Sequence, residues 1–237
     1  MSMLAPTLEA FFTQRLMAQK NASPNTIASY RDCFRLLLGF VHDRTGKAPS
    51  GLGIDDLDAP MIAAFLDHLE HERGTTISSR NTRLAAIRSL FRFAAYRHPE
   101  HAALIQRVLA IPSKRSERAM VSFLTVAEVD ALLASPDRST WIGRRDHALL
   151  MLAVQTGLRV SEVTGLCRRD LHLGTGAHVR CEGKGRKERA TPLTRNTVAV
   201  LNVFLTERAG WRDDALFPGP RGAALGRDAV RRLVARH

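Results

Sequence analysis

Apolar residues recur every three or four positions through residues 1–111, the spacing that places them on one face of a helix. Ser23 and Pro24 mark a helix start, since serine accepts from the first free amides and proline lacks the N–H that the first turn leaves unused. Asp58 begins a second helix, MIAAFLDHLEHER, which Gly74 ends. A third, ISSRNTRLAAIRSLFRFAAY, stops before Pro99. The pattern predicts a helical first domain.

The third of these helices combines an apolar stripe with a basic edge. At about 100° per residue, Leu84, Ile87, Phe91 and Ala94 fall on one stripe. The residues beside the stripe that are candidates for DNA contact are Arg80, Asn81, Arg83, Arg88 and Arg92. One interpretation is an amphipathic helix with solvated arginines, and the other is a helix laid in the major groove, where Arg and Asn reach phosphates and base edges.

A polar segment, PSKRSERAM, follows the helices and has the composition of a linker. It predicts a helical DNA-binding domain over residues 1–111, a linker over 112–120 and a second domain over 121–237. The second domain begins with Thr125 and Glu128, spaced as a capping box at the start of a new helix.

The stretch TGLRVSEVTGL follows a long apolar helix, RRDHALLMLAVQ, and places an arginine in a sharp turn. Gly157 permits the turn, and Arg159 then stands at the start of a short helix. Free backbone N–H groups and a guanidinium can point at one phosphate from such a position. Glu162, three residues on and on the same face, can orient the guanidinium or pair with it.

Beyond this helix the period changes to that of strands. AHVRCE and RATPL are short alternating runs on either side of GKGRKE, whose glycines suit a hairpin turn. Lys184 lies between those glycines. A lysine in such a place is ordinarily just solvated, but together with Arg159 it can protonate a phosphate's leaving oxygen. The stretch GKG is not a Walker A loop, because GxxxxGK[ST] is absent.

The net charge of the chain indicates which kind of partner it binds. The chain has 35 Lys and Arg against 23 Asp and Glu, a net charge of +12, of which residues 1–111 carry +3 and residues 112–237 carry +9. A polyanion partner is expected, since each cation set against a phosphate releases condensed counterions. The alternative is that the charge serves solubility alone.

Other classes of protein have weaker support. No apolar run approaches the roughly 20 residues that cross a bilayer, and no secretory signal is visible, so we expect a cytoplasmic protein. The three cysteines are widely separated and lack metal-ligand spacing. Two HxxH pairs, at residues 68–71 and 98–101, have no third ligand nearby, so we expect no metal site.

RRDHALLMLAVQTGLRVSEVTGL, GKGRKERATPL and ALFPG, in that order, resemble the catalytic domain of tyrosine recombinases, the phage integrase and Xer-type family. SPNTIASYRDCFRLLLGF and RNTRLAAIRSLFRFA resemble the same family's helical core-binding domain. The resemblance implies an integrase-like α+β fold, mainly α, with a SAM-like core-binding domain followed by a mixed catalytic domain with a small antiparallel sheet. It further implies a clamp around double-stranded DNA and assembly with other recombinase subunits as a tetramer.

The resemblance also implies roles for individual residues. Arg159 matches the arginine that binds the scissile phosphate, Glu162 the acidic residue that supports it, and Lys184 the lysine that protonates the leaving 5′-oxygen. Lys187 and Arg189 are expected to contact DNA. In the family a tyrosine forms a 3′-phosphotyrosyl link that conserves the energy of the broken bond, so neither metal nor other cofactor is expected.

One part of the family's pattern is missing. The family places an HxxR pair and the nucleophilic tyrosine beyond the segment that matches LFPG, whereas the twenty residues after Phe217 contain neither. We therefore expect that the C-terminal part of the catalytic domain is absent. Three interpretations remain: a site-specific recombinase, integrase or transposase shown incomplete, a catalytically inactive DNA-binding module that occupies recombination sites, or an accidental match.

The position of the tyrosines gives a testable prediction. Tyr30 and Tyr96 both lie in the first domain, in helices whose periodicity favours packing for each. Attack on phosphorus requires a nucleophile within about 3–3.5 Å. The 237-residue polypeptide should therefore form no denaturation-resistant adduct with a nicked suicide substrate. An adduct that forms with the parent chain and is lost when Tyr30 or Tyr96 is replaced by Phe would contradict this prediction.

Overall fold

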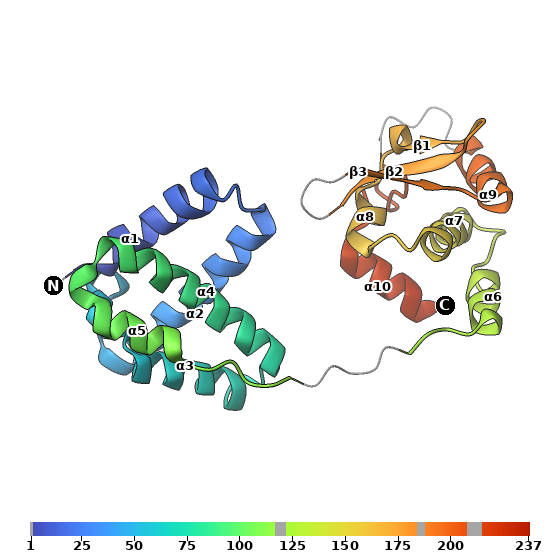
Figure 1. Cartoon of the computed structure of the whole chain (residues 1–237). Helices are drawn as coiled ribbons and strands as arrows, with labels where there is room; N and C mark the ends of the chain where they lie inside the picture. The colour runs from blue at the N-terminus through green and yellow to red at the C-terminus, as the bar shows by residue number, and fades with distance from the viewer. Residues whose placement is uncertain (1, 117–121, 184–187, 208–214) are drawn as a thin grey trace. The chain divides into compact units, whose positions relative to one another are not determined.

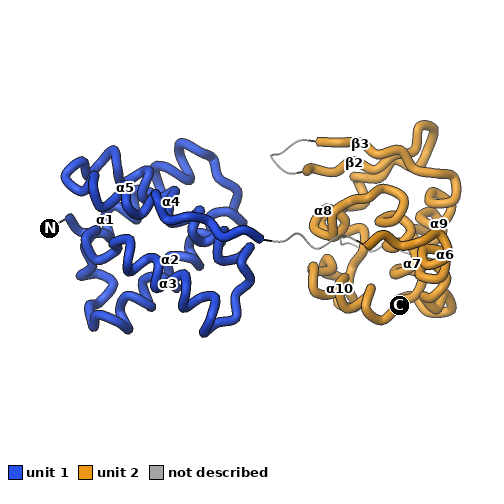
Figure 2. The backbone as a smooth tube through the Cα atoms, turned by 60° about the horizontal axis from the view of Figure 1, so that its bottom comes forward, with its two compact units in different colours: residues 1–120 blue, residues 121–237 orange. Residues whose placement is uncertain are grey.

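The structure is a computed structural model that describes residues 2–116, 122–183, 188–207 and 215–237. The chain divides into two compact units, unit 1 over residues 1–120 and unit 2 over residues 121–237 (Figure 2). Lys184 and Lys187 lie outside the described residues, as do positions 117–120 of the expected linker.

Unit 1 is built from helices. They are α1 (Leu4–Ala10), the π-helix η1 (Phe11–Gln19), α2 (Pro24–Thr45), α3 (Ala59–His71), α4 (Ile77–Arg97) and α5 (Ala102–Ala110), with short 3₁₀ turns η2 (Pro49–Gly51), η3 (Ile54–Leu57) and η4 (Pro99–His101). The predicted starts are confirmed: the Ser23 side chain accepts from Thr26 N–H, and the Asp58 side chain accepts from Met61 N–H. Each cap satisfies an amide that the helix itself leaves without a partner.

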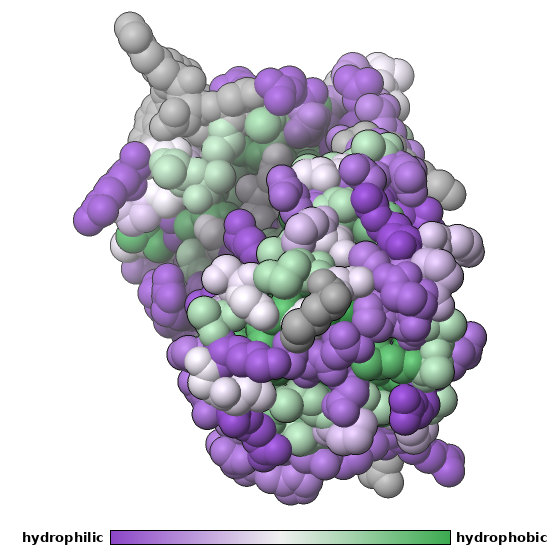
Figure 3. Space-filling view, turned by 90° about the vertical axis from the view of Figure 1, so that its left-hand side faces the viewer, coloured by the Kyte–Doolittle hydropathy of each residue, from purple (hydrophilic) through white to green (hydrophobic). Residues whose placement is uncertain are grey.

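The apolar stripe of α4 lies at the centre of unit 1. Leu84, Ile87, Phe91 and Ala94 are all buried, as predicted, and they pack with residues of α2, α3 and α5. On the face shown in Figure 3, hydrophilic side chains predominate and hydrophobic ones appear between them in small areas. Burial of the α4 stripe therefore fixes which side of the helix faces outward.

The two tyrosines of unit 1 differ in environment. Tyr30 is partly buried and stacks on Phe11, with ring centroids 6.1 Å apart. Tyr96 is 89% exposed, so the prediction that it packs in the core is wrong. It follows Ala94 by two positions, about 200° further round α4, which turns it away from the stripe.

Unit 2 combines helices with a small sheet that lies along one side of them (Figure 1). Its elements are α6 (Val126–Ala134), α7 (Trp141–Thr156), α8 (Val160–Gly165), the 3₁₀ turn η5 (Arg168–Asp170), β1 (Leu171–His172), β2 (His178–Glu182), β3 (Glu188–Pro192), α9 (Arg195–Thr206) and α10 (Arg227–Arg236). The three strands are antiparallel in the order β1-β2-β3, which confirms the predicted hairpin strands. The register pairs Glu182 with Glu188 and Cys181 with Arg189.

The core of unit 2 holds the start of α8 in place. Leu149 and Leu152 of α7 pack with Leu201 and Phe204 of α9, and Val179 of β2 belongs to the same cluster. The short helix α8 contacts both α7 and α10. Among the described residues no helix combines the length and apolar character needed to cross a membrane.

The packing of α7 gives a prediction with a built-in control. A Cβ at Gly143 would collide with the backbone carbonyl of Asp137, whereas a Cβ at Gly39 in α2 would meet nothing within 4 Å. Gly143→Ala should lower the free energy of unfolding by roughly 1–3 kcal/mol, because a backbone group cannot turn aside. Gly39→Ala should raise it by about 0.5–1 kcal/mol. Urea unfolding followed by circular dichroism checks both, and a Gly143→Ala chain as stable as the parent would contradict the packing.

Candidate functional site

The turn between α7 and α8 presents Arg159 at the surface of unit 2. Helix α7 ends at Thr156, and the next residue, Gly157, has a φ of +60°, in the left-handed region where a glycine has no steric penalty. Gly157 N–H bonds to the carbonyl of Ala153, and the buried side chain of Leu158 anchors the turn in the core. Arg159 then occupies the N-cap position of α8, with 65% of its side chain exposed.

Glu162 is the buried partner of this arginine. Its side chain is 5% exposed and accepts from Arg159 twice, from the backbone N–H at 2.7 Å and from Nη1 at 2.9 Å. The first bond caps α8, and the second orients the guanidinium. One end of Arg159 is therefore fixed while the exposed remainder can donate to a ligand.

The same carboxylate also bonds to the sheet. Arg189 of β3 donates from Nη2 to Oε2 of Glu162 at 2.8 Å and from Nε to the Sγ of Cys181 at 3.3 Å. Arg189, which is expected from its sequence position to contact DNA, therefore reaches Arg159 through a shared carboxylate. Its role as a DNA contact stays a prediction, and its observed partners are within unit 2.

Hydrogen bonds and neighbouring charges shift the pKa values of Glu162 and Arg189. The pKa of Glu162 is lowered, first because its carboxylate accepts the backbone N–H of Arg159, and then through the side chains of Arg159 and Arg189. The pKa of Arg189 is raised, with its bond to Cys181 as the largest cause. Glu162 is therefore a carboxylate at neutral pH, and Arg159 keeps its charged partner.

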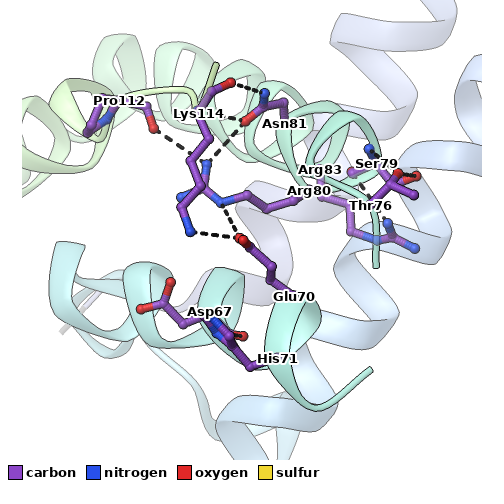
Figure 4. Close-up of polar contacts among 10 residues, drawn as sticks. All are labelled: Asp67, Glu70, His71, Thr76, Ser79, Arg80, Asn81, Arg83, Pro112 and Lys114. Atoms are coloured by element: carbon purple, nitrogen blue, oxygen red, sulfur yellow. Dashed lines mark hydrogen bonds and ion pairs between the residues drawn. The ribbon is translucent and has the colours of Figure 1, made fainter. Parts of the chain in front are cut away.

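The predicted basic edge of α4 contacts the chain's own interdomain segment, residues 111–114. Asn81 donates from Nδ2 to the carbonyl of Lys114 at 2.7 Å and accepts from Lys114 N–H at 3.1 Å (Figure 4). Lys114 Nζ lies 2.8 Å from Glu70 Oε2, and that hydrogen bond is the main reason why the pKa of Glu70 is lowered. The start of the expected linker is thus hydrogen-bonded to unit 1.

Two arginines of α4 add to this attachment. Arg88 donates to the carbonyl of Ile111 and to Oγ of Ser113. Arg80 lies 3.9 Å from Glu70 and 3.5 Å from the carbonyl of Pro112, and its side chain is only 6% exposed. We expected Arg80 on a solvent-facing edge; it is instead covered, because the interdomain segment lies over it. To meet DNA it would first have to leave Glu70.

The remaining candidates of α4 lie elsewhere. Arg83 donates to the carbonyl of Ser79, one turn earlier in the helix. Arg92 lines a hollow of about 280 Å³ together with Arg15, Lys20 and the exposed Tyr96. The sequence gives no sign of this grouping, because Arg15 and Lys20 lie some seventy residues before Arg92 and no local pattern joins them.

Comparison with known families covers both units. The phage integrase family matches residues 122–237, and the phage integrase N-terminal SAM-like domain matches residues 10–98. A putative integrase/recombinase, y4rC, of Sinorhizobium fredii is 59% identical over 234 residues, which cover 99% of this chain and 70% of that protein. A tyrosine recombinase XerC of Pelobacter propionicus is 34% identical over 231 residues, covering 95% and 72%.

Solved structures show the same fold at lower identity. A lambda integrase tetramer bound to a Holliday junction has a TM-score of 0.67 and 20% identity, covering 100% of this chain and 65% of that one. The recombinase XerH, in a post-cleavage complex with its palindromic difH substrate, has a TM-score of 0.66 and 23% identity, covering 92% and 64%. This chain therefore spans slightly less than two thirds of either solved chain.

The lowered pKa of Glu162 predicts how stability depends on pH. Its pKa falls below the ordinary value of 4.5 on folding, so its stabilising contribution is complete above that pH and is lost as the pH drops through the lowered pKa. Glu162→Gln removes this contribution. The difference in free energy of unfolding between the parent chain and Glu162→Gln should therefore be constant from pH 7 to about 5 and shrink at more acidic pH. Urea unfolding at a series of pH values measures it, and a difference independent of pH would refute the assignment.

Proposed function

The chain belongs to the phage integrase family of tyrosine recombinases, and from that premise we propose that it binds double-stranded DNA and holds a backbone phosphate at Arg159 for strand cutting and rejoining. The observation that carries the proposal is the pairing of Arg159 with the buried Glu162. A guanidinium fixed at one end and exposed at the other is preorganised to donate two parallel bonds to phosphate oxygens.

In the reaction that the family implies, Arg159, Glu162 and Lys184 each have a separate role. A tyrosine oxygen attacks phosphorus, the bond from phosphorus to the 5′-oxygen breaks, and the lysine that Lys184 matches gives that oxygen a proton. Arg159 neutralises the charge that grows on the phosphate oxygens, while Glu162 keeps the arginine aligned. Rejoining reverses these steps, so bond energy is retained in the phosphotyrosyl link.

We also propose partners and a cellular location for this chain. The lambda integrase structure is a tetramer on a Holliday junction, so we extend assembly with other recombinase subunits on DNA to this chain. A protein that acts on DNA also needs access to the chromosome, and we place its action in the cytoplasm.

A second candidate function is a DNA-binding module that occupies recombination sites without cutting them. One observation favours it: both tyrosines of these 237 residues, Tyr30 and Tyr96, belong to unit 1. The absence of a covalent adduct together with tight DNA binding would be the outcome for this candidate.

DNA binding by the 237-residue chain tests what both candidates share. Its affinity for duplex DNA should fall steeply with salt, because phosphate contacts release counterions. Arg92→Ala should reduce the slope of log affinity against log salt by about 0.9 if Arg92 meets one phosphate. Arg88→Ala should weaken binding with little change in slope, since its observed partners belong to the interdomain segment.

Fluorescence anisotropy with a labelled duplex, titrated across a series of KCl concentrations, measures both the affinity and the slope. Arg107→Ala on α5 is the matched control, because it removes an exposed arginine whose observed bond is to the carbonyl of Ala103 in its own helix. Binding that is indifferent to salt would overturn the proposed function. Equal slope changes for all three variants would instead remove the special place of Arg92.

A further inference from the structure

We propose that Arg189 is a positioning residue for the phosphate site, whose charge offsets Glu162 so that Arg159 remains attractive to a DNA phosphate. This inference rests on the proposed function of Arg159. It gives Arg189 a role inside unit 2, different from the direct DNA contact that the sequence suggested.

The geometry comes from the register of the hairpin. Arg189 pairs with Cys181 across β2 and β3, and its Nε donates to the buried Cys181 Sγ at 3.3 Å. That bond directs the guanidinium along the sheet toward α8, where Nη2 meets Glu162 Oε2 at 2.8 Å. The side chain is 43% exposed, so it is held at both ends without being buried.

The charges explain why a second arginine matters. Arg159 and Glu162 alone form a neutral pair, and a carboxylate beside the binding position repels an incoming phosphate. Arg189 brings a second positive charge to the same carboxylate, so the three side chains together carry one net positive charge. Because Glu162 is buried, water screens its charge only weakly, and the guanidiniums must do so.

Further acidic side chains near Glu162 increase the need for a second positive charge. A hollow of about 500 Å³ opens beside Glu162 and is lined by the carboxylates of Asp170, Glu182 and Glu188 as well. Among the described residues, two arginines, Arg169 and Arg180, also line it. Among the described lining residues, acidic side chains therefore outnumber arginines, and Arg189 is the arginine that the sheet contributes to Glu162 beside Arg159 of α8.

A charge-rescue experiment separates this role from a structural one. Binding of inorganic phosphate to the 237-residue chain is followed through the Nε–Hε NMR resonance of Arg159, and duplex DNA affinity is measured in parallel. Arg189→Gln should weaken phosphate binding at Arg159 by about fivefold, whereas Arg189→Lys, which keeps the charge, should recover most of the loss.

The double variant Glu162→Gln with Arg189→Gln provides the decisive comparison. Because Glu162 itself aligns Arg159, the double variant is compared with Glu162→Gln alone and not with the parent chain. Once the carboxylate is gone, Arg189 has no negative charge to offset, so adding Arg189→Gln should change phosphate affinity by less than about twofold. A further loss as large as that caused by Arg189→Gln in the parent chain would show that Arg189 acts independently of Glu162 and would overturn the proposal.

Arg180→Gln on β2 is the matched control, since it removes the same charge from the neighbouring strand without touching a bond to Glu162 in the described structure. It should change phosphate affinity by less than about twofold; a loss equal to that of Arg189→Gln would reduce the effect to overall charge and refute the proposal. If the Arg159 resonance of the parent chain does not shift when phosphate is added, and Arg159→Ala leaves DNA affinity unchanged, the proposed function fails as well. If both respond and Arg189→Gln does not, this inference alone fails.

Discussion

Burial of the Glu162 carboxylate is the constraint on which the arrangement of unit 2 depends. A charged group removed from water must find donors within the protein, and Glu162 finds them in the backbone and side chain of Arg159 and in the guanidinium of Arg189. These donors come from the turn after α7 and from strand β3. One buried negative charge thereby fixes the start of a helix, the aim of an exposed arginine and the position of a hairpin.

The local parts of this structure could be predicted from sequence because their causes are local. Ser23 and Thr125 each accept from an amide three residues further along the chain, so a short stretch of sequence is enough to identify the helix start. The pairing of Arg159 with Glu162 has the same origin, since residues three apart share a helix face. The bond from Arg189 was not predictable, because it depends on the register of β2 and β3 and on how the sheet packs against α8.

Helix α4 shows which contacts a sequence pattern cannot predict. Its periodicity identifies the buried stripe correctly, because burial is the main cause of apolar spacing. It does not identify what the flanking polar residues contact. Arg88 donates to the carbonyl of Ile111 in its own chain. An arginine that binds a DNA phosphate could occupy the same position in the sequence pattern, so the pattern does not distinguish the two. The exposed Tyr96 adds that an aromatic residue near the end of a helix need not follow the stripe.

The attachment of residues 111–114 to α4 also determines the length of the tether between two DNA-binding units. A shorter connection between two binding units raises the effective concentration of one unit where the other has bound. The side chains of Asn81 and Arg88 shorten this connection, because they hold residues 111–114 on unit 1. Substitutions on α4 that loosen this attachment would therefore lengthen the connection and lower the avidity of the two units for DNA.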